Sequence, residues 1–296
     1  MFSALSHRPM QLNPLTLAFA GEERALEAEF RVTYYQANRR TIVWTYLAGL
    51  CAYIAFGWLD VLVFGAAHER LWALRFGAAC PVLVALLLAM RLRGFGRVWQ
   101  PALAFSVLIG GGAIVAMTVV APPPYNNTYY AGAVLVLLFC HTVSRLRFLW
   151  AAVAGWAVVL AYVATAVFVT KPPPQILAGN TFFFVSTNLL GMVACYAMEY
   201  HARRGFWLMR QLAAEKARVQ ESHRELERRL AELQEERETV RVLRGLIPIC
   251  SHCRRIRDDK GYWNQLEQYI REHSQAQFSH GICPECAQKY YSEYLK

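Results

Sequence analysis

Six long apolar segments constrain this chain more than any other feature of its sequence. A helix of about 20 apolar residues spans the roughly 30 Å hydrocarbon layer of a bilayer. Lipid offers no partner for open backbone N–H and C=O groups, so each segment should be a continuous helix. Only eleven charged residues fall between residues 41 and 200. We therefore predict an all-α membrane protein with a six-helix transmembrane domain over residues 41–204, its spans being 41–64, 71–91, 99–120, 128–146, 148–170 and 178–200.

The loops between these segments indicate how the bundle is oriented. Lys and Arg accumulate in the short cytoplasmic loops of membrane proteins. Only Arg70 and Lys171 fall in the loops on one side. The basic residues on the other side are Arg31, Arg39, Arg40, Arg91, Arg93, Arg97, Arg145, Arg147, Arg203 and Arg204. This asymmetry predicts that both termini are cytoplasmic and that residues 1–40 form a cytoplasmic N-terminal segment.

Three ionisable residues at membrane depth are candidate ligand-binding residues. An ionisable group in lipid costs several kcal/mol unless it is paired. Asp60 and Arg75 lie on either side of a short turn, so they could form a structural ion pair or line a pocket that faces outward. His141 lies near the inner end of the segment 128–146. Together with His201 it could ligate haem, although lone histidines near an interface more often hydrogen-bond to their neighbours.

Residues 205–246 are predicted to form a charged linker helix that continues directly from the sixth segment. One column of apolar residues recurs at the heptad spacing of a coiled-coil seam. The companion column is mostly polar, so the pattern predicts a weak parallel homodimer that can shift or rotate, or else a solvated monomeric helix. The seam residues are Leu212, Val219, Leu226, Leu233, Val240 and Ile247.

The C-terminal segment 247–296 contains two C-x-x-C pairs, Cys250 with Cys253 and Cys283 with Cys286. Four thiolates can surround a tetrahedral zinc ion, and four protein ligands leave no open position for a substrate. A module of this size has little apolar core, so a structural metal would stabilise it. We therefore predict a small module with structural Zn²⁺. A dithiol/disulfide switch is the alternative, because C-x-x-C pairs also do redox chemistry.

The residues between the two cysteine pairs suggest how this module is covered. Trp263, Leu266 and Ile270 have helical spacing and could lie over the metal site. The basic run at 254–257 could contact nucleic acid or acidic lipid. Because two aspartates follow it directly at 258–259, a solvated and self-compensated turn is the better interpretation.

Four stretches of the membrane half resemble the six-helix N-terminal domain of bacterial class III adenylate cyclases. The resemblance implies a membrane anchor that receives a signal and passes it through a helical transducer to a cytoplasmic output. Only about 50 residues follow the linker, too few for the cyclase catalytic domain, so we expect no enzymatic activity. The stretches are 29-EFRVTYYQANRR-40, 46-YLAGLCAYIAFGWLD-60, 74-LRFGAACPVLVALLL-88 and 129-YYAGAVLVLLFCHTVSRLRF-148.

The tail resembles a cysteine-pair module found at the C-terminus of bacterial sensor and response-regulator proteins. This resemblance implies a signalling context rather than a particular mechanism. The matching stretches are 249–250, 255–259, 261–263 and 278–286.

These observations lead to one hypothesis and two alternatives. We expect a multi-pass protein of the bacterial inner membrane that binds a small lipophilic molecule entering between its helices. The linker would relay the signal to the zinc module, which would dock a cytoplasmic protein. The alternatives are a membrane redox protein with haem or a dithiol switch, and a membrane-tethered regulator that binds nucleic acid.

Overall fold

A computed structural model describes residues 10–123, 127, 129–244, 247–258 and 260–291 of this 296-residue chain. The chain divides into two compact units, Met1–Ala213 and Ala214–Lys296. We call the first the membrane unit and the second the tail unit, and describe each by itself.

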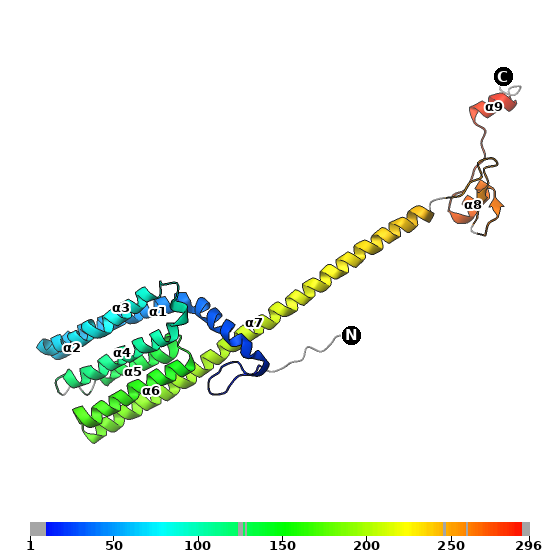
Figure 1. The fold of residues 1–296 in the computed structure, drawn as a ribbon. Helices are drawn as coiled ribbons and strands as arrows, with labels where there is room; N and C mark the ends of the chain where they lie inside the picture. Colours follow the sequence, from blue (N-terminus) through cyan, green and yellow to red (C-terminus); the bar gives the residue numbers. More distant parts are fainter. Residues whose placement is uncertain (1–9, 124–126, 128, 245–246, 259, 292–296) are drawn as a thin grey trace. The chain divides into compact units, whose positions relative to one another are not determined.

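The membrane unit is built from helices (Figure 1). Among the described residues of this unit, three π-helical turns, η3, η6 and η7, lie within or at the end of its apolar helices. In chain order the elements are η1 (Gly21–Ala25), α1 (Leu26–Phe64), η2 (Gly65–Ala67), α2 (His68–Leu74), η3 (Arg75–Ala79), α3 (Cys80–Ala89), η4 (Phe95–Arg97), α4 (Trp99–Val120), α5 (Tyr130–Leu138), η6 (Phe139–Val143), α6 (Phe148–Thr165), η7 (Ala166–Thr170) and the first part of α7 (Pro174–Arg244).

Five helical stretches of the described chain are long and apolar enough to cross a membrane. They are Gly21–Phe64, His68–Ala89, Trp99–Val120, Phe148–Thr170 and Pro174–Glu238. The fourth predicted segment, 128–146, corresponds to a shorter apolar helix, Tyr130–Val143. At 1.5 Å per residue that helix rises roughly 21 Å, which is less than the hydrocarbon thickness. The helical state of the apolar segments is confirmed, whereas the count of six spans stays a prediction.

Glycine and proline end the apolar helices at their loops. Gly65 closes α1 with a φ of +50°, a conformation that a residue without Cβ adopts freely. Helix α4 ends just before Pro122 and Pro123, and Pro174 opens α7 at the first helical position, where its missing N–H costs nothing.

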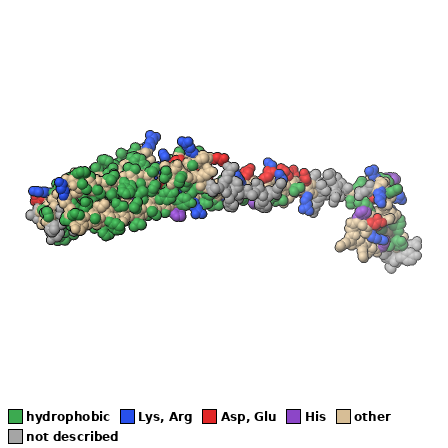
Figure 2. Space-filling view, turned by 90° about the horizontal axis from the view of Figure 1, so that it is seen from below, with side chains coloured by type: hydrophobic (Ala, Val, Ile, Leu, Met, Phe, Trp, Pro, Cys, Tyr) green, Lys and Arg blue, Asp and Glu red, His purple; other side chains and the backbone are tan. Residues whose placement is uncertain are grey.

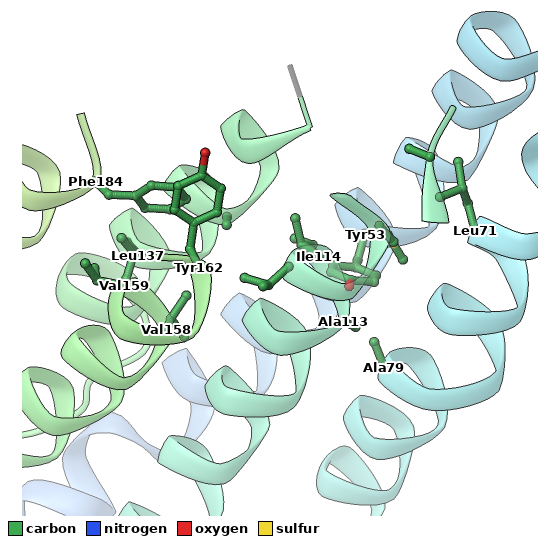
Figure 3. Packing of buried hydrophobic residues seen from close by; sticks show 14 of the residues in the cluster. Tyr53, Leu71, Ala79, Ala113, Ile114, Leu137, Val158, Val159, Tyr162 and Phe184 are labelled. Atoms are coloured by element: carbon green, nitrogen blue, oxygen red, sulfur yellow. The ribbon is translucent and has the colours of Figure 1, made fainter. Parts of the chain in front are cut away.

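Helix α4 lies at the centre of the bundle. It contacts α2, α3, α5 and α6, and it is the most buried of the candidate spans. Figure 3 shows Ala113 and Ile114 of α4 within a cluster that also includes Leu137, Val158 and Phe184. The core therefore follows α4 rather than the edge of the bundle.

Many large apolar side chains lie exposed on the outer surface of the membrane unit. Trp58, Phe168 and Leu190 are each more than 70% exposed. On the face seen in Figure 2, hydrophobic side chains cover the membrane unit, and Lys and Arg side chains lie toward its ends. An apolar surface of this extent is a liability in water and suits contact with lipid.

His141 fills a gap that two glycines leave between η6, α6 and α7. Its imidazole Nε2 lies 2.9 Å from Asn188 Oδ1 on α7. A Cβ atom on Gly191 of α7 would come within 2.6 Å of the His141 ring, and one on Gly155 of α6 would come within 2.3 Å of Asn188 Oδ1. Only glycine fits at these two positions, so η6, α6 and α7 can approach closely around the histidine.

Helix α7 is a single element of 71 residues that contains the sixth apolar segment and continues through the charged linker. The seam side chains of Leu212, Val219, Leu226 and Leu233 are 55–65% exposed. The side chain of Val240 lies outside the described residues. A parallel dimer through this seam stays a prediction.

The tail unit departs from an all-helical fold. After α7 it contains two short antiparallel strands, β1 (Ile256–Arg257) and β2 (Trp263–Asn264), and then α8 (Leu266–His273) and α9 (Pro284–Tyr291). The prediction that Trp263 lies on one helix with Leu266 and Ile270 is wrong. Trp263 pairs with Arg257 in the sheet, and α8 begins only at Leu266.

The hydrogen bonds of Asp258 explain why Trp263 lies in a strand and not in a helix. Its carboxylate accepts hydrogen bonds from the backbone N–H groups of Lys260 and Tyr262 and from the side-chain amide of Asn264, at 2.8–3.0 Å. These bonds fix the β1–β2 turn and favour strands on either side of it. Desolvation acts to raise the pKa of Asp258, and the three hydrogen bonds outweigh it, so the net shift is downward.

We expect Gly191→Ala to destabilise the membrane unit by about 1–3 kcal/mol, because the new methyl group would overlap the His141 ring. Gly179→Ala on the same helix is the matched control, since a Cβ there meets nothing within 4 Å. That change should be neutral or stabilising by up to ~1 kcal/mol. Thermal unfolding of both full-length variants in one detergent measures the difference, and equal midpoints would contradict the packing described here.

Candidate ligand-binding cavity and ionic cluster

A cavity of about 400 Å³ lies between α1, η3, α3, α4 and α5. This volume falls within the range of sites that hold small organic ligands. Most of its lining is apolar, including Phe56, Leu59, Val63, Leu83, Ile114 and Leu135. A ligand that fills it would therefore be mainly hydrocarbon.

Asp60 and Arg75 form a buried ion pair in the wall of this cavity. Arg75 donates from Nε to Asp60 Oδ2 at 2.8 Å and from Nη2 to Asp60 Oδ1 at 3.0 Å, a bidentate geometry. The Tyr129 hydroxyl accepts from Arg75 Nη2 at 3.0 Å and donates to Asp60 Oδ1. The two charged side chains are only 2–3% exposed. The pair is thus desolvated, neutral as a whole and held in one geometry.

Tyr53 adds a second support for Arg75 from the preceding turns of α1. Its carbonyl oxygen accepts from Arg75 Nη1 at 3.1 Å, and the guanidinium lies 4.9 Å from the centre of its ring. The Tyr53 hydroxyl in turn donates to the Gly110 carbonyl of α4 at 3.1 Å. The charged group is therefore connected to both α1 and α4.

The structure places the sequence-predicted residues in two different locations. Asp60 and Arg75 are brought together, and they both form an ion pair and line a cavity, so the two interpretations of them are compatible. His141 lies apart from the cavity lining, packed against Asn188 between η6 and α7. His201 is exposed on α7 beside Tyr200. Tyr129, which the sequence analysis did not single out, belongs to the Asp60–Arg75 cluster.

A second buried charge cluster, which we call the ionic cluster, lies where α7 leaves the apolar bundle. Its centre is Arg203, whose side chain is fully buried. Arg203 donates from Nη1 to Glu27 of α1 at 2.7 Å, and from Nη2 and Nε to Glu199 of α7 at 2.7 and 2.9 Å. Glu199 also accepts from the backbone N–H of Phe148 at 2.6 Å, at the start of α6. The cluster therefore connects α1, α6 and α7.

Aromatic side chains shield the ionic cluster from water. The Arg203 guanidinium lies 4.3 Å from the ring centre of Phe30 and 5.4 Å from that of Phe19. Both rings are nearly fully buried. The backbone N–H of Phe19 also donates to Glu27 at 3.2 Å, and this hydrogen bond holds the chain before α1 against the ionic cluster. In such a dry setting ion pairs are stronger than in water, and an unpaired charge is costly.

Sequence reasoning assigned Arg203 to a basic loop and did not single out Glu27 or Glu199. The i,i+4 spacing of Glu199 and Arg203 on one helix was a usable signal. Glu27 could not have been found in this way, because its contact with Arg203 joins residues 176 positions apart. It also depends on α1 beginning at Leu26, within the segment that was predicted to precede the bundle.

The comparison with protein families bears on the membrane unit. Residues 58–213 match MASE8, a family of membrane-associated sensory domains, over just over half of the chain. The chain belongs to the MASE8 family. A comparison with curated proteins found no match.

The MASE8 match and the membrane unit end at the same residue, Ala213. The match includes Asp60, Arg75 and Arg203, so both buried charge clusters have members within the MASE8 domain. Glu27 and the tail unit lie outside it. The resemblances to cyclase N-terminal domains and to a C-terminal cysteine module therefore stay predictions.

The cysteine pairs of the tail unit lie in two different backbone settings. Cys250 and Cys253 occupy a tight turn whose ends pair through Ile249 and Ile256, with Cys250 N–H donating to the Arg255 carbonyl at 2.8 Å. Cys283 directly precedes α9, and Cys286 lies in its first turn. Both settings present backbone N–H groups to sulfur.

These N–H groups change the acidity of the thiols. The pKa of Cys250 is lowered by hydrogen bonds from the backbone of Cys253 and His252 and from the Cys253 thiol. The pKa of Cys283 is lowered by the backbone and thiol of Cys286. A lowered pKa favours the thiolate, which is both the zinc ligand and the redox nucleophile.

Each pair therefore has the chemistry of half a zinc site, but the structure does not assemble a whole one. Within residues 10–123, 127, 129–244, 247–258 and 260–291, no three His, Cys, Asp or Glu side chains form a group that could hold a metal ion. Zinc bound by Cys250, Cys253, Cys283 and Cys286 stays a prediction.

Arg203→Met should destabilise the protein strongly, because Glu199 would remain buried without the cation it is paired with. Breaking a buried pair costs about 3–5 kcal/mol, which corresponds to a fall of roughly 10 °C in Tm for a protein of this size. Arg204→Met is the matched control, since Arg204 is exposed at the next position of α7. Thermal unfolding in detergent should leave this control within about 2 °C of wild type. Equal losses in the two variants would contradict the cluster.

If the tail holds structural zinc, the purified full-length protein should contain about one zinc ion per chain. Cys250→Ser and Cys283→Ser should each lose it, whereas Cys51→Ser, at an exposed cysteine of α1, should retain it. Elemental analysis after dialysis measures the metal content. A metal-free wild-type protein whose tail cysteines are oxidised by intact mass would instead support the dithiol switch.

Proposed function

We propose that this MASE8 protein is a membrane sensor that binds a small lipophilic molecule in the cavity and relays its presence through α7 to the tail. The observation that carries the proposal is the apolar cavity whose wall contains the desolvated Asp60–Arg75 pair. A buried ion pair is weak support for stability alone, because apolar residues of similar volume would often serve as well. Its presence beside an open volume therefore favours a role in binding.

Helix α1 provides the physical connection from the cavity to the linker. Its residues from Tyr46 to Phe64 line the cavity, and Glu27 of the same helix pairs with Arg203 of α7. A ligand that shifts or rotates α1 would change the Glu27–Arg203 contact at the start of the linker. Two discrete packings with different ligand affinities are what such a relay requires.

In this proposal the signal leaves the membrane unit through the α7 seam and the tail. The exposed apolar side chains of α7 suit a weak homodimer in which a rotation of α7 changes the spacing of the two tails. A zinc-stapled tail would then dock a cytoplasmic protein with its surface rather than catalyse a reaction. We place the protein in a bacterial inner membrane with both termini cytoplasmic, on the strength of its loop charges.

A dithiol switch in the tail is the second candidate function. The lowered pKa of Cys250 and Cys283 favours it, because reactive cysteines are those with thiolate character and exposure. In that case the tail would report the redox state of the cytoplasm, and the membrane unit would serve as its anchor.

The cavity can be tested with a photoreactive hydrocarbon, a decyl chain carrying a diazirine, added to full-length protein in lipid nanodiscs. We expect labelling of α1 and α5 peptides that line the cavity. Gly132→Leu should abolish that labelling, because Gly132 lines the cavity and a Cβ there is tolerated at 3.5 Å from Ile114.

Gly112→Leu is the matched control. Gly112 lies on α4 outside the cavity lining, and a Cβ there meets nothing within 4 Å. This variant should be labelled like the wild type. Labelling that is spread evenly over the lipid-facing surface in all three proteins would reject the cavity as a binding site.

A further inference from the structure

We propose that the cavity selects a lipophilic molecule with an uncharged, oxygen-bearing head group, and that it rejects amphiphiles with an anionic or a cationic head. This inference rests on the proposed function, because it names the chemical class of the ligand for that same cavity. It follows from a count of the charges and hydrogen bonds around Arg75.

The charges at the polar end of the cavity already cancel. Among the described residues that line the cavity, Asp60 and Arg75 are the charged ones, and they form a bidentate pair. A carboxylate or phosphate head would have to displace Asp60 from Arg75 and leave that carboxylate buried without its cation. An ammonium head would leave Arg75 unpaired in the same way. Either exchange leaves one buried charge uncompensated, which is strongly unfavourable in a low-dielectric site.

The hydrogen bonds of Arg75 leave a place for one acceptor. A guanidinium has five N–H hydrogens. Two point to Asp60, one to the Tyr129 hydroxyl and one to the Tyr53 carbonyl, and the Met117 sulfur also lies 3.9 Å from Nη2. Within the described part of the chain, the second Nη1–H of Arg75 thus has no oxygen acceptor. A hydroxyl or carbonyl oxygen on a ligand can accept it without disturbing the pair.

The remaining wall explains why the rest of the ligand should be hydrocarbon. The lining polar groups other than Asp60 and Arg75 already have neighbours in the protein: the Tyr53 hydroxyl donates to the Gly110 carbonyl, and Ser106 Oγ donates to the Leu103 carbonyl. The Tyr46 hydroxyl lies 3.4 Å from Ser106 Oγ. A second polar group on the ligand would find few free partners there, so a single oxygen-bearing head on an apolar body fits best.

The test is competition against the decyl diazirine in nanodiscs, with three unlabelled competitors of equal chain length: 1-decanol, decyl sulfate and decylammonium. We expect 1-decanol to suppress cavity labelling at a concentration at least about tenfold below either charged competitor. Decyl sulfate keeps its charge at every pH used, so protonation cannot disguise an anion as a neutral molecule. A charged competitor that equals or exceeds 1-decanol would overturn the inference.

Two variants connect the selectivity to the named groups. Asp60→Asn leaves the Arg75 charge uncompensated, so preference should move toward decyl sulfate. Tyr129→Phe keeps the ion pair but frees the Nη2–H that the hydroxyl accepted, so charge selectivity should persist; this variant covers the case in which Asp60→Asn fails to fold. Loss of the discrimination against charged heads in Tyr129→Phe would count against the charge argument.

The outcomes separate this inference from the proposed function. If the hydrocarbon probe does not label the cavity in wild-type protein, the proposed function fails and the inference with it. If the probe labels the cavity but decyl sulfate competes best, the sensor proposal stands and only the uncharged head group is rejected.

Discussion

The structure depends on one constraint, which is that a charge inside a water-free helix bundle must be neutralised by a neighbour. Arg75 and Arg203 are both buried, and each is held against a carboxylate with near-ideal hydrogen-bond distances. These pairs set the positions of the helices that contribute to them, because moving any one would expose a bare charge to a low-dielectric interior. Apolar packing fills the space between these pairs.

Helix α1 contributes a carboxylate to each of the two buried charge clusters. Asp60 near one end of α1 forms an ion pair with Arg75, and Glu27 near the other end forms one with Arg203 of α7. The cavity lies along the first contact and the linker begins at the second. Arg75 and His141 also lie in π-helical turns, which interrupt regular helices and frequently accompany functional sites. Helix α1 is therefore held by a buried charge contact near each of its ends.

Sequence reasoning predicted the parts of the fold that depend on local pattern. Apolar length and the lack of hydrogen-bond partners in lipid are sufficient to predict helices, and the short turn between Asp60 and Arg75 makes their pairing predictable. The Tyr129 hydroxyl and the Glu27–Arg203 contact were missed because they join residues 69 and 176 positions apart, which no periodicity encodes. The strand at Trp263 was missed because Asp258 organises the preceding turn through three hydrogen bonds, and this overrides the helical spacing.

The covering of Arg203 by Phe19 and Phe30 has a practical consequence for anyone who handles this protein. Phe19 lies just ahead of α1, and its ring packs on the Arg203 guanidinium, whose side chain is fully buried. Removing the residues around Phe19, or attaching a bulky tag close to it, would expose Glu27 and Glu199 to solvent and weaken their ion pairs with Arg203 of α7.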